Sequence, residues 1–116
     1  MTINEIIELQ KKFDSSHCGN FRWNEQIDEN SINILQFLVI SLCGEVGETA
    51  NIIKKIVRGD YKLEEKREEL SEEIIDVFIY LLKLSYQLNI DIEKEYISKM
   101  AKNKERFKQY ENTITE

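Results

Sequence analysis

Two pairs of acidic residues stand in apolar surroundings, where carboxylates are costly. Glu45 and Glu48 are the only charged residues between positions 34 and 53, and Asp76 is the only one between positions 74 and 82. Glu73 lies at the edge of the second run. A carboxylate that loses hydration needs a compensating partner. A divalent cation provides one, because hard cations prefer carboxylate oxygens.

The spacing of these acids suits a shared metal site. Residues three apart lie on one helix face, with about 5–6 Å between their Cβ atoms. Glu45/Glu48 on one helix and Glu73/Asp76 on an antiparallel neighbour would converge on one site. Four carboxylates can hold one or two Mg²⁺ ions, or Mn²⁺ as a substitute, and leave positions open for phosphate oxygens and water. Glu45 and Glu48 are also the candidates for a catalytic general base.

Two competing interpretations apply to the same acids. The spacing itself is not specific, since Glu5/Glu8, Glu65/Glu68 and Glu69/Glu72 share it on what we interpret as solvated helix faces. The four acids would then simply pair with lysines at the rim of a bundle, for which Lys54, Lys55 and Lys83 are available. A di-iron site requires Glu-x-x-His pairs. The only histidine, His17, lies far from either acid pair, which excludes that site.

A second polar face is predicted near the end of the chain. Lys99, Asn103 and Arg106 are spaced by four and then three residues, so they project from one side of a helix. Two cations with an amide between them suit a polyphosphate, since lysine acts as a point charge and arginine as a fork. An ordinary solvated face is the alternative.

Two aromatic residues are candidates for contacts with a nucleoside. Trp23 can stack on a base, although a single tryptophan also serves as a core or loop anchor. Tyr80 follows Asp76 by four residues on the same side of its helix, where it would contact a sugar or line the pocket. A hydrogen bond inside the bundle is the alternative for Tyr80.

The elements that must position these residues are four helices joined by short polar connections. Expected helices cover residues 3–13, 30 or 31 to 58, 63–88 and 91–110, with turn formers at 15–20 and an ordered loop at 21–30. Gly59-Asp60 provides a helix stop, and Asp91 is a plausible N-cap. A packing seam is expected along the third helix at Leu70, Ile74, Val77, Leu81, Leu84 and Leu88.

Composition favours one all-α domain spanning residues 1–116. The chain has no proline and four glycines, and it is 33% charged and 41% hydrophobic, which suits amphipathic helices and is too apolar for disorder. A net charge of −6 repels a nucleic-acid backbone, so nucleic-acid binding is not expected.

The expected architecture is a four-helix bundle-like fold. Residues 34–43 and 74–82 are apolar over more than one face, so we expect part of this surface to pack against a second subunit. We expect no membrane span and no signal peptide, because no apolar run approaches membrane-spanning length and no signal pattern precedes the first helix. With two cysteines in unlike contexts, no disulfide is expected, and a cytoplasmic location is the default.

The order of these motifs resembles the MazG-type all-α nucleoside triphosphate pyrophosphatases. That family carries Glu-x-x-Glu on one helix and Glu-x-x-Asp on the next, and here residues 44–48 read Gly-Glu-Val-Gly-Glu. Residues 72–81 read Glu-Glu-Ile-Ile-Asp-Val-Phe-Ile-Tyr-Leu. Lys99, Asn103 and Arg106 resemble the family's Lys…Asn…Arg ending, so the resemblance covers residues 35–107.

The resemblance implies an enzyme that cleaves a nucleoside triphosphate between its α- and β-phosphates, giving a monophosphate and pyrophosphate. It assigns the metal to the four acids, triphosphate or sugar contacts to Lys99 and Asn103, and a further contact to Arg106. It also implies dimers or tetramers with sites near subunit interfaces. The dCTP-specific branch has an aromatic residue where residues 52–55 read Ile-Ile-Lys-Lys, and an upstream histidine that His17 does not match. Base preference is therefore left open.

Two other functions remain open at this point. An acidic helical interaction module would bind a protein through residues 34–43 or the third-helix seam, without Mg²⁺ or nucleotide. Within the enzymes, a dimeric dUTPase or a phosphoribosyl-ATP pyrophosphatase is the alternative.

Overall fold

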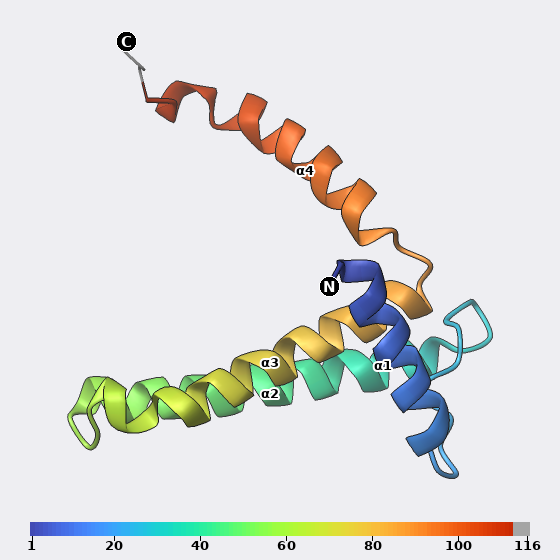
Figure 1. Ribbon diagram of the computed structural model, residues 1–116, viewed down its shortest axis with the longest axis horizontal. Helices are drawn as coiled ribbons and strands as arrows, with labels where there is room; N and C mark the ends of the chain where they lie inside the picture. The colour runs from blue at the N-terminus through green and yellow to red at the C-terminus, as the bar shows by residue number, and fades with distance from the viewer. Residues whose placement is uncertain (113–116) are drawn as a thin grey trace.

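The computed structural model describes residues 1–112, which are helical throughout apart from short connections. The elements are α1 (Ile3–His17), α2 (Ile32–Arg58), α3 (Leu63–Gln87), α4 (Ile92–Arg106) and the short 3₁₀ helix η1 (Lys108–Tyr110), all shown in Figure 1. No strand occurs among the residues described. The predicted all-α fold class is confirmed.

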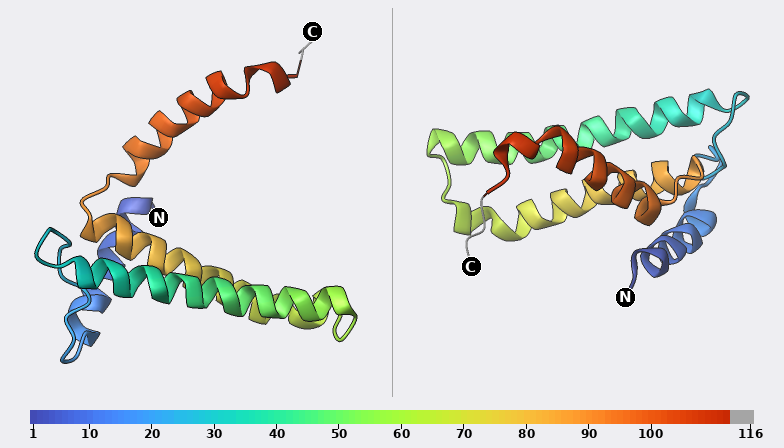
Figure 2. Two further views of the ribbon diagram at one scale, coloured as in Figure 1. Left: turned by 180° about the vertical axis from the view of Figure 1, so that it is seen from behind. Right: turned by 90° about the horizontal axis from the view of Figure 1, so that it is seen from above.

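The long helices α2 and α3 form an antiparallel hairpin, and they lie side by side in every view (Figures 1 and 2). α2 ends at Gly59, whose φ of 94° is a left-handed conformation that glycine adopts without steric cost. The N–H of Gly59 donates to the carbonyl of Ile56, and the N–H of Asp60 donates to that of Lys55. This tight reversal brings the two acid-bearing helices together.

α1 crosses the C-terminal part of α3 and extends four residues beyond its predicted end. The hydroxyl groups of Ser15 and Ser16 both donate to the carbonyl of Lys12, at 2.9 and 3.1 Å. These turn-forming residues therefore bond back to the helix rather than ending it. At the other end, the Thr2 side chain caps α1 by accepting from the N–H of Glu5.

The predicted ordered loop between α1 and α2 is held by one residue of α3. The side-chain amide of Gln87 donates to the carbonyls of Trp23 and Glu25, both at 2.7 Å. The carbonyl of Gln87 accepts from the N–H of Ile27 at 2.8 Å. Three hydrogen bonds to the backbone of a connecting segment fix its path, which confirms that it is ordered.

The hydrophobic core is small and lies where α1, the loop and the hairpin meet. Its buried apolar residues are Ile7, Ile27, Ile34, Leu38 and Leu82. The predicted seam on α3 is wrong in part, because Ile74, Leu81 and Leu88 are exposed. The α3 positions that are buried instead are Leu82, Lys83 and Gln87, since α1 and the loop cover that face.

Most of α4 projects away from the other helices (Figures 1 and 2). It begins at the predicted cap, where the Asp91 carboxylate accepts from the N–H of Lys94 at 3.1 Å. It ends at Arg106, earlier than predicted, and a turn at Phe107 leads into η1. The fourth helix of the expected bundle thus lies apart from the other three within one chain, and its apolar side chains Tyr96, Ile97 and Met100 are exposed.

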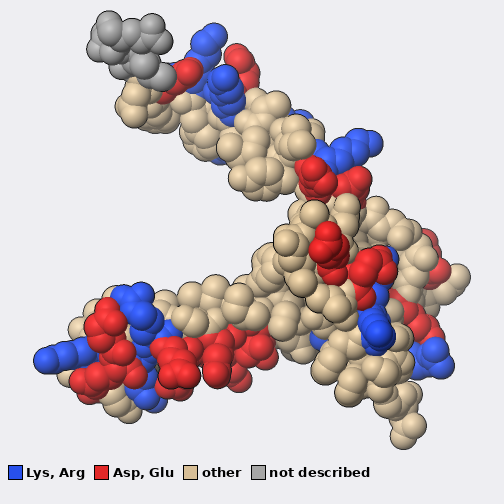
Figure 3. Space-filling view, in the orientation of Figure 1, with Lys and Arg blue, Asp and Glu red and all other residues tan. Residues whose placement is uncertain are grey.

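The outward faces of the hairpin are also apolar. Phe37, Ile40, Ile75 and Phe78 are among the exposed large side chains. By length and composition alone, α2 is apolar enough to cross a membrane, so the expectation that no run reaches that length is wrong. Figure 3 shows broad uncharged areas on the hairpin and on α4, with acidic groups gathered along one edge of the hairpin. Exposed apolar surface of this extent is typical of an interface with another molecule.

Candidate metal and nucleotide site

The acid cluster forms where the middle of α2 faces the middle of α3. One carboxylate oxygen each from Glu45, Glu73 and Asp76 lies within 4.8 Å of the others. Glu48 lies one turn along α2 from Glu45, and its charge acts on both Glu45 and Glu73. The structure therefore brings together the two acid pairs that the sequence singled out.

Two oxygens of this cluster have no partner. Oε2 of Glu45 and Oε2 of Glu73 are buried and make no hydrogen bond. Among residues 1–112, no salt bridge involves any of the four acids, and Lys83 pairs with Asp14 instead. The interpretation that these acids pair with rim lysines is therefore wrong. Buried carboxylate oxygens without a partner are the donor set that a hard divalent cation accepts.

The pKa values of two acids in the cluster are raised, as expected where carboxylates lie close together without a cation. Hydrogen bonding of protonated Glu73 to Glu48, together with burial and the charges of Glu48, Glu45 and Asp76, raises the pKa of Glu73 from 4.5 to about 7. Burial raises the pKa of Glu45, and the charges of Glu48 and Asp76 raise it further. Like charges held close together favour the protonated form, and a bound cation relieves this repulsion.

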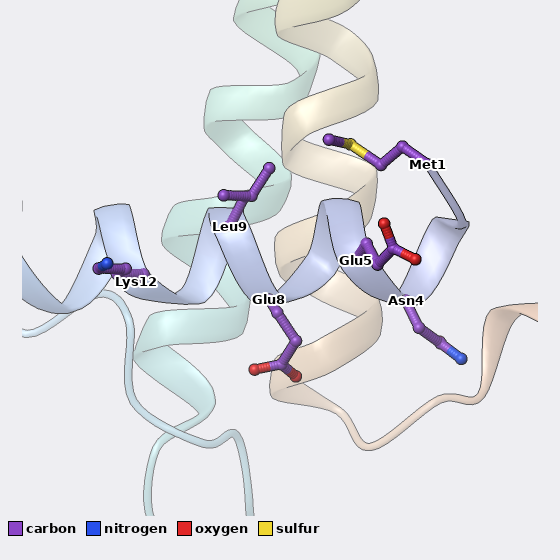
Figure 4. A pocket seen from close by; sticks show the side chains of 6 residues that line it. All are labelled: Met1, Asn4, Glu5, Glu8, Leu9 and Lys12. Atoms are coloured by element: carbon purple, nitrogen blue, oxygen red, sulfur yellow. The ribbon is translucent and has the colours of Figure 1, made fainter.

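The cluster is open to solvent on the α3 side. A surface depression of about 410 Å³ is lined by Ser71, Glu72, Ile75 and Asp76. A larger depression, about 590 Å³, lies on α1 and is lined by Met1, Asn4, Glu5, Glu8, Leu9 and Lys12 (Figure 4). All six side chains come from one end of the chain, on or just before a single helix, and none belongs to the acid cluster. We therefore place the chemistry at the smaller depression, which reaches Asp76.

Of the aromatic candidates, Tyr80 lies further along the same face of α3, and Trp23 lies in the loop between α1 and α2. Tyr80 packs against the core, and the Lys83 ammonium lies 4.6 Å from the centre of its ring. The same ammonium lies 4.2 Å from the centre of the Trp23 ring. Trp23 and Tyr80 are thus brought together through Lys83, which sequence reasoning considered only as a partner for the acids. A signal was present, because Lys83 is the only charged residue between positions 77 and 90.

The predicted phosphate-binding residues are not at the acid cluster within one chain. Lys99, Asn103 and Arg106 lie on α4, which leads away from the hairpin (Figure 1). Lys99 and Arg106 are exposed, and the Arg106 guanidinium lies 5.0 Å from the ring centre of Phe107. Their side chains are available to another molecule.

Comparison with known proteins decides the family. The model of the MazG nucleotide pyrophosphohydrolase domain matches residues 35–110, more than half of the chain. The chain belongs to the MazG nucleotide pyrophosphohydrolase family. The matched segment of this MazG chain contains the four acids and Tyr80, together with Lys99, Asn103 and Arg106 of α4, whereas α1 and Trp23 precede it.

Relatives of this MazG chain include a phage protein and mammalian enzymes. It is 33% identical over 84 residues to the Gene 37 protein of Mycobacterium phage L5, covering 68% of this chain and 74% of that protein. It is 36% identical over 74 residues to dCTP pyrophosphatase 1 of Rattus norvegicus and 34% identical over 74 residues to that of Homo sapiens. These two alignments cover 60% of this chain and 44% of each relative. The chain therefore spans less than half the length of the mammalian relatives. No solved structure matches the chain.

Proposed function

We propose that this MazG chain hydrolyses nucleoside triphosphates to a monophosphate and pyrophosphate with Mg²⁺ as the cofactor. The observation that carries the proposal is the pair of buried, unpartnered oxygens on Glu45 and Glu73, from two helices, beside Asp76. The relatives named dCTP pyrophosphatase 1 support the same reaction class.

The four acids would hold Mg²⁺. When bound, the ion neutralises charge on the phosphates and on the departing pyrophosphate. Glu45 or Glu48 accepts a proton from the attacking water, whose oxygen then forms a bond to the α-phosphorus. The bond from that phosphorus to the oxygen bridging to the β-phosphate breaks, and pyrophosphate departs with this oxygen and its electron pair.

The phosphate tail would be held by α4. Lys99 and Arg106 offer cationic donors and Asn103 an amide donor from one helix side. Because α4 points away from the hairpin of its own chain, we propose that it serves the acid cluster of a second copy in a homodimer or homotetramer. Its exposed apolar residues, Ile97 and Met100, would pack in the same interface.

The proposal is tested by incubating the protein with Mg²⁺ and a panel of canonical and modified nucleoside triphosphates. Monophosphate and pyrophosphate are measured together, with inorganic phosphate as a third readout. Equal release of the first two products, with no inorganic phosphate, identifies cleavage between the α- and β-phosphates. The ranking across the panel names the substrate class, including whether dCTP or dUTP is preferred.

A helical interaction module is the contrasting outcome. Such a protein would show no turnover with Mg²⁺ or Mn²⁺, and its melting temperature would not respond to metal plus nucleotide. A ligand that binds only the folded state raises the melting temperature. The absence of turnover, together with a melting temperature that does not respond to metal plus nucleotide, overturns the proposed function.

A further inference from the structure

Lys83 is a largely buried cation whose ammonium keeps some contact with solvent. It is 8% exposed, and its ammonium carries three donors. No hydrogen bond from it exists within residues 1–112. Its neighbours are the rings of Trp23 and Tyr80, whose centres lie at 4.2 and 4.6 Å, and these supply attraction but no acceptor atom.

The one opposite charge beside Lys83 is largely engaged elsewhere. Asp14 is completely buried, and its Oδ1 lies 3.8 Å from the Lys83 ammonium, beyond hydrogen-bonding distance. The side-chain amide of Gln10 donates to Oδ1 at 2.8 Å, and the hydroxyl of Tyr86 donates to Oδ2 at 2.5 Å. Asp14 therefore balances the charge of Lys83 and leaves its donors free. Burial lowers the pKa of Lys83, and the nearby carboxylate of Asp14 opposes this shift.

The position of Lys83 relates it to the acid cluster. Glu73, Asp76, Tyr80 and Lys83 are spaced by three, four and three residues, so they follow one face of α3. Seven residues separate Asp76 from Lys83, which is about 10 Å along a helix axis. If the phosphates of a nucleotide lie at the acids, its sugar and base can extend along α3 over a similar length. The edge of the base would then lie near Lys83.

We propose that Lys83 reads the nucleobase, donating a hydrogen bond to a carbonyl oxygen at the base edge beside Trp23. The proposal rests on the proposed function for the class of ligand. An ammonium is a donor only, so it fits the oxygens of uracil, thymine, cytosine, hypoxanthine and guanine. Adenine has an amino group and no carbonyl oxygen, and it offers only ring nitrogens. The site therefore discriminates in favour of bases with a carbonyl oxygen.

The test uses the fluorescence of Trp23, which is the only tryptophan in the chain. The full chain is titrated in the presence of Mg²⁺ with dUMP, dTMP, dCMP, dGMP, dIMP and dAMP, none of which has a bond between α- and β-phosphates to cleave. Of these, dIMP and dAMP share every atom except the 6-substituent of the base and the proton on N1. We expect the best carbonyl-bearing nucleotide to bind at least about tenfold more tightly than dAMP, the size of one charged hydrogen bond. In Lys83→Met, that nucleotide should lose about tenfold in affinity, while dAMP changes by less than about twofold.

Two further variants control for the chemical change itself and for misfolding of Lys83→Met. Lys54→Met makes the same chemical change at an exposed position and should leave every affinity unchanged. Asp14→Asn combined with Lys83→Met removes both charges together and should reproduce the lost preference if the single variant fails to fold. Equal loss for all bases, an unchanged preference, or no saturable signal with any nucleotide overturns the assignment.

The readout also separates this assignment from the proposed function. Monophosphate binding with a base preference that depends on Lys83, but without pyrophosphate release from any triphosphate in the presence of Mg²⁺, refutes the function and supports the assignment. If the protein hydrolyses triphosphates and Lys83→Met changes kcat/KM equally for all bases, the proposed function is supported and the assignment of Lys83 is refuted.

Discussion

Glu45 on α2 and Glu73 on α3 hold carboxylate oxygens within 4.8 Å of each other, and each keeps one buried oxygen without a hydrogen-bond partner. Two like charges in this arrangement repel, and burial makes each harder to ionise. The residues that repel each other in the free protein are therefore those that would bind a divalent cation together. The same two residues are therefore expected to lower the stability of the metal-free protein and to be needed for metal binding.

Removing one ligand should abolish most of the activity without unfolding the chain. We expect Asp76→Asn to lower kcat/KM for pyrophosphate release by about 100-fold or more, since even residues behind a metal's ligands typically cost 10–100-fold. Glu68→Gln is the matched control, because Glu68 is exposed and belongs to a Glu-x-x-Glu pair outside the cluster. Wild-type rates for Asp76→Asn, with an intact circular dichroism spectrum, would remove Asp76 from the metal site.

The raised pKa of Glu73 predicts how stability depends on pH. In the metal-free protein this pKa is about 7 against an ordinary 4.5, so the folded state holds the proton more tightly than the unfolded state. Its contribution to stability is therefore present below about pH 4.5 and is lost as the pH rises to about 7. Thermal melts in EDTA between pH 4 and 8.5 should show this loss, and Glu73→Gln should reduce it.

Bound metal should stabilise the protein more at high pH than at low pH, opposite to the trend expected without metal. Carboxylates must be deprotonated to bind a cation, so Mg²⁺ or Mn²⁺ should raise the melting temperature more at pH 8 than at pH 5.5. An equal rise at both pH values would contradict a role for Glu73 in the site.

Much of this arrangement follows from local sequence rules. Gly59 and Asp91 mark a helix end and a helix start, because a left-handed glycine and a carboxylate cap work within one turn. The acid cluster was predictable because charges inside apolar runs need a partner. Both cysteines are free, as expected.

Long-range packing was not predictable in the same way. The apolar seam on α3 gave no indication that α1 and the loop cover the adjacent face, so Ile74 and Leu81 were assigned to the wrong side. The direction of α4 depends on a short connection after Gln87 and on contacts beyond one chain. Gly44 and Gly47 flank Glu45 on α2, and no neighbouring atom within residues 1–112 would meet a Cβ at either position.

The exposed apolar face of α4 should hold an assembly together. Ile97 is 64% exposed in the single chain, and we expect Ile97→Asp to shift the protein to a smaller species in light scattering coupled to size exclusion. Activity should fall with it, since Lys99 and Asn103 would no longer reach the acids of another copy. Ser98→Asp places the same charge on the adjacent exposed residue and should change neither. An unchanged mass for Ile97→Asp would exclude this face from the interface.

The buried carboxylate of Asp14 should be important for stability. Asp14→Ala leaves Lys83 without its counter-charge and removes the acceptor of Gln10 and Tyr86, so we expect a loss of about 3–5 kcal/mol in urea unfolding. Asp14→Asn keeps the shape and should cost less. Glu8→Ala on the same helix breaks only an exposed pair with Lys11 and should cost at most about 1 kcal/mol. Similar losses for Asp14→Ala and Glu8→Ala would show that the buried network contributes little.

The small core has a further consequence. Five buried apolar residues within the described range 1–112 are few for a domain of this length. In the assembly proposed above, a second copy would cover the outward apolar surface of the hairpin. Part of the free energy that holds the fold then comes from association. Dilution should lower the unfolding midpoint, and specific activity should rise with protein concentration. The expression level in a cell would thus set how well each molecule works as well as how many there are.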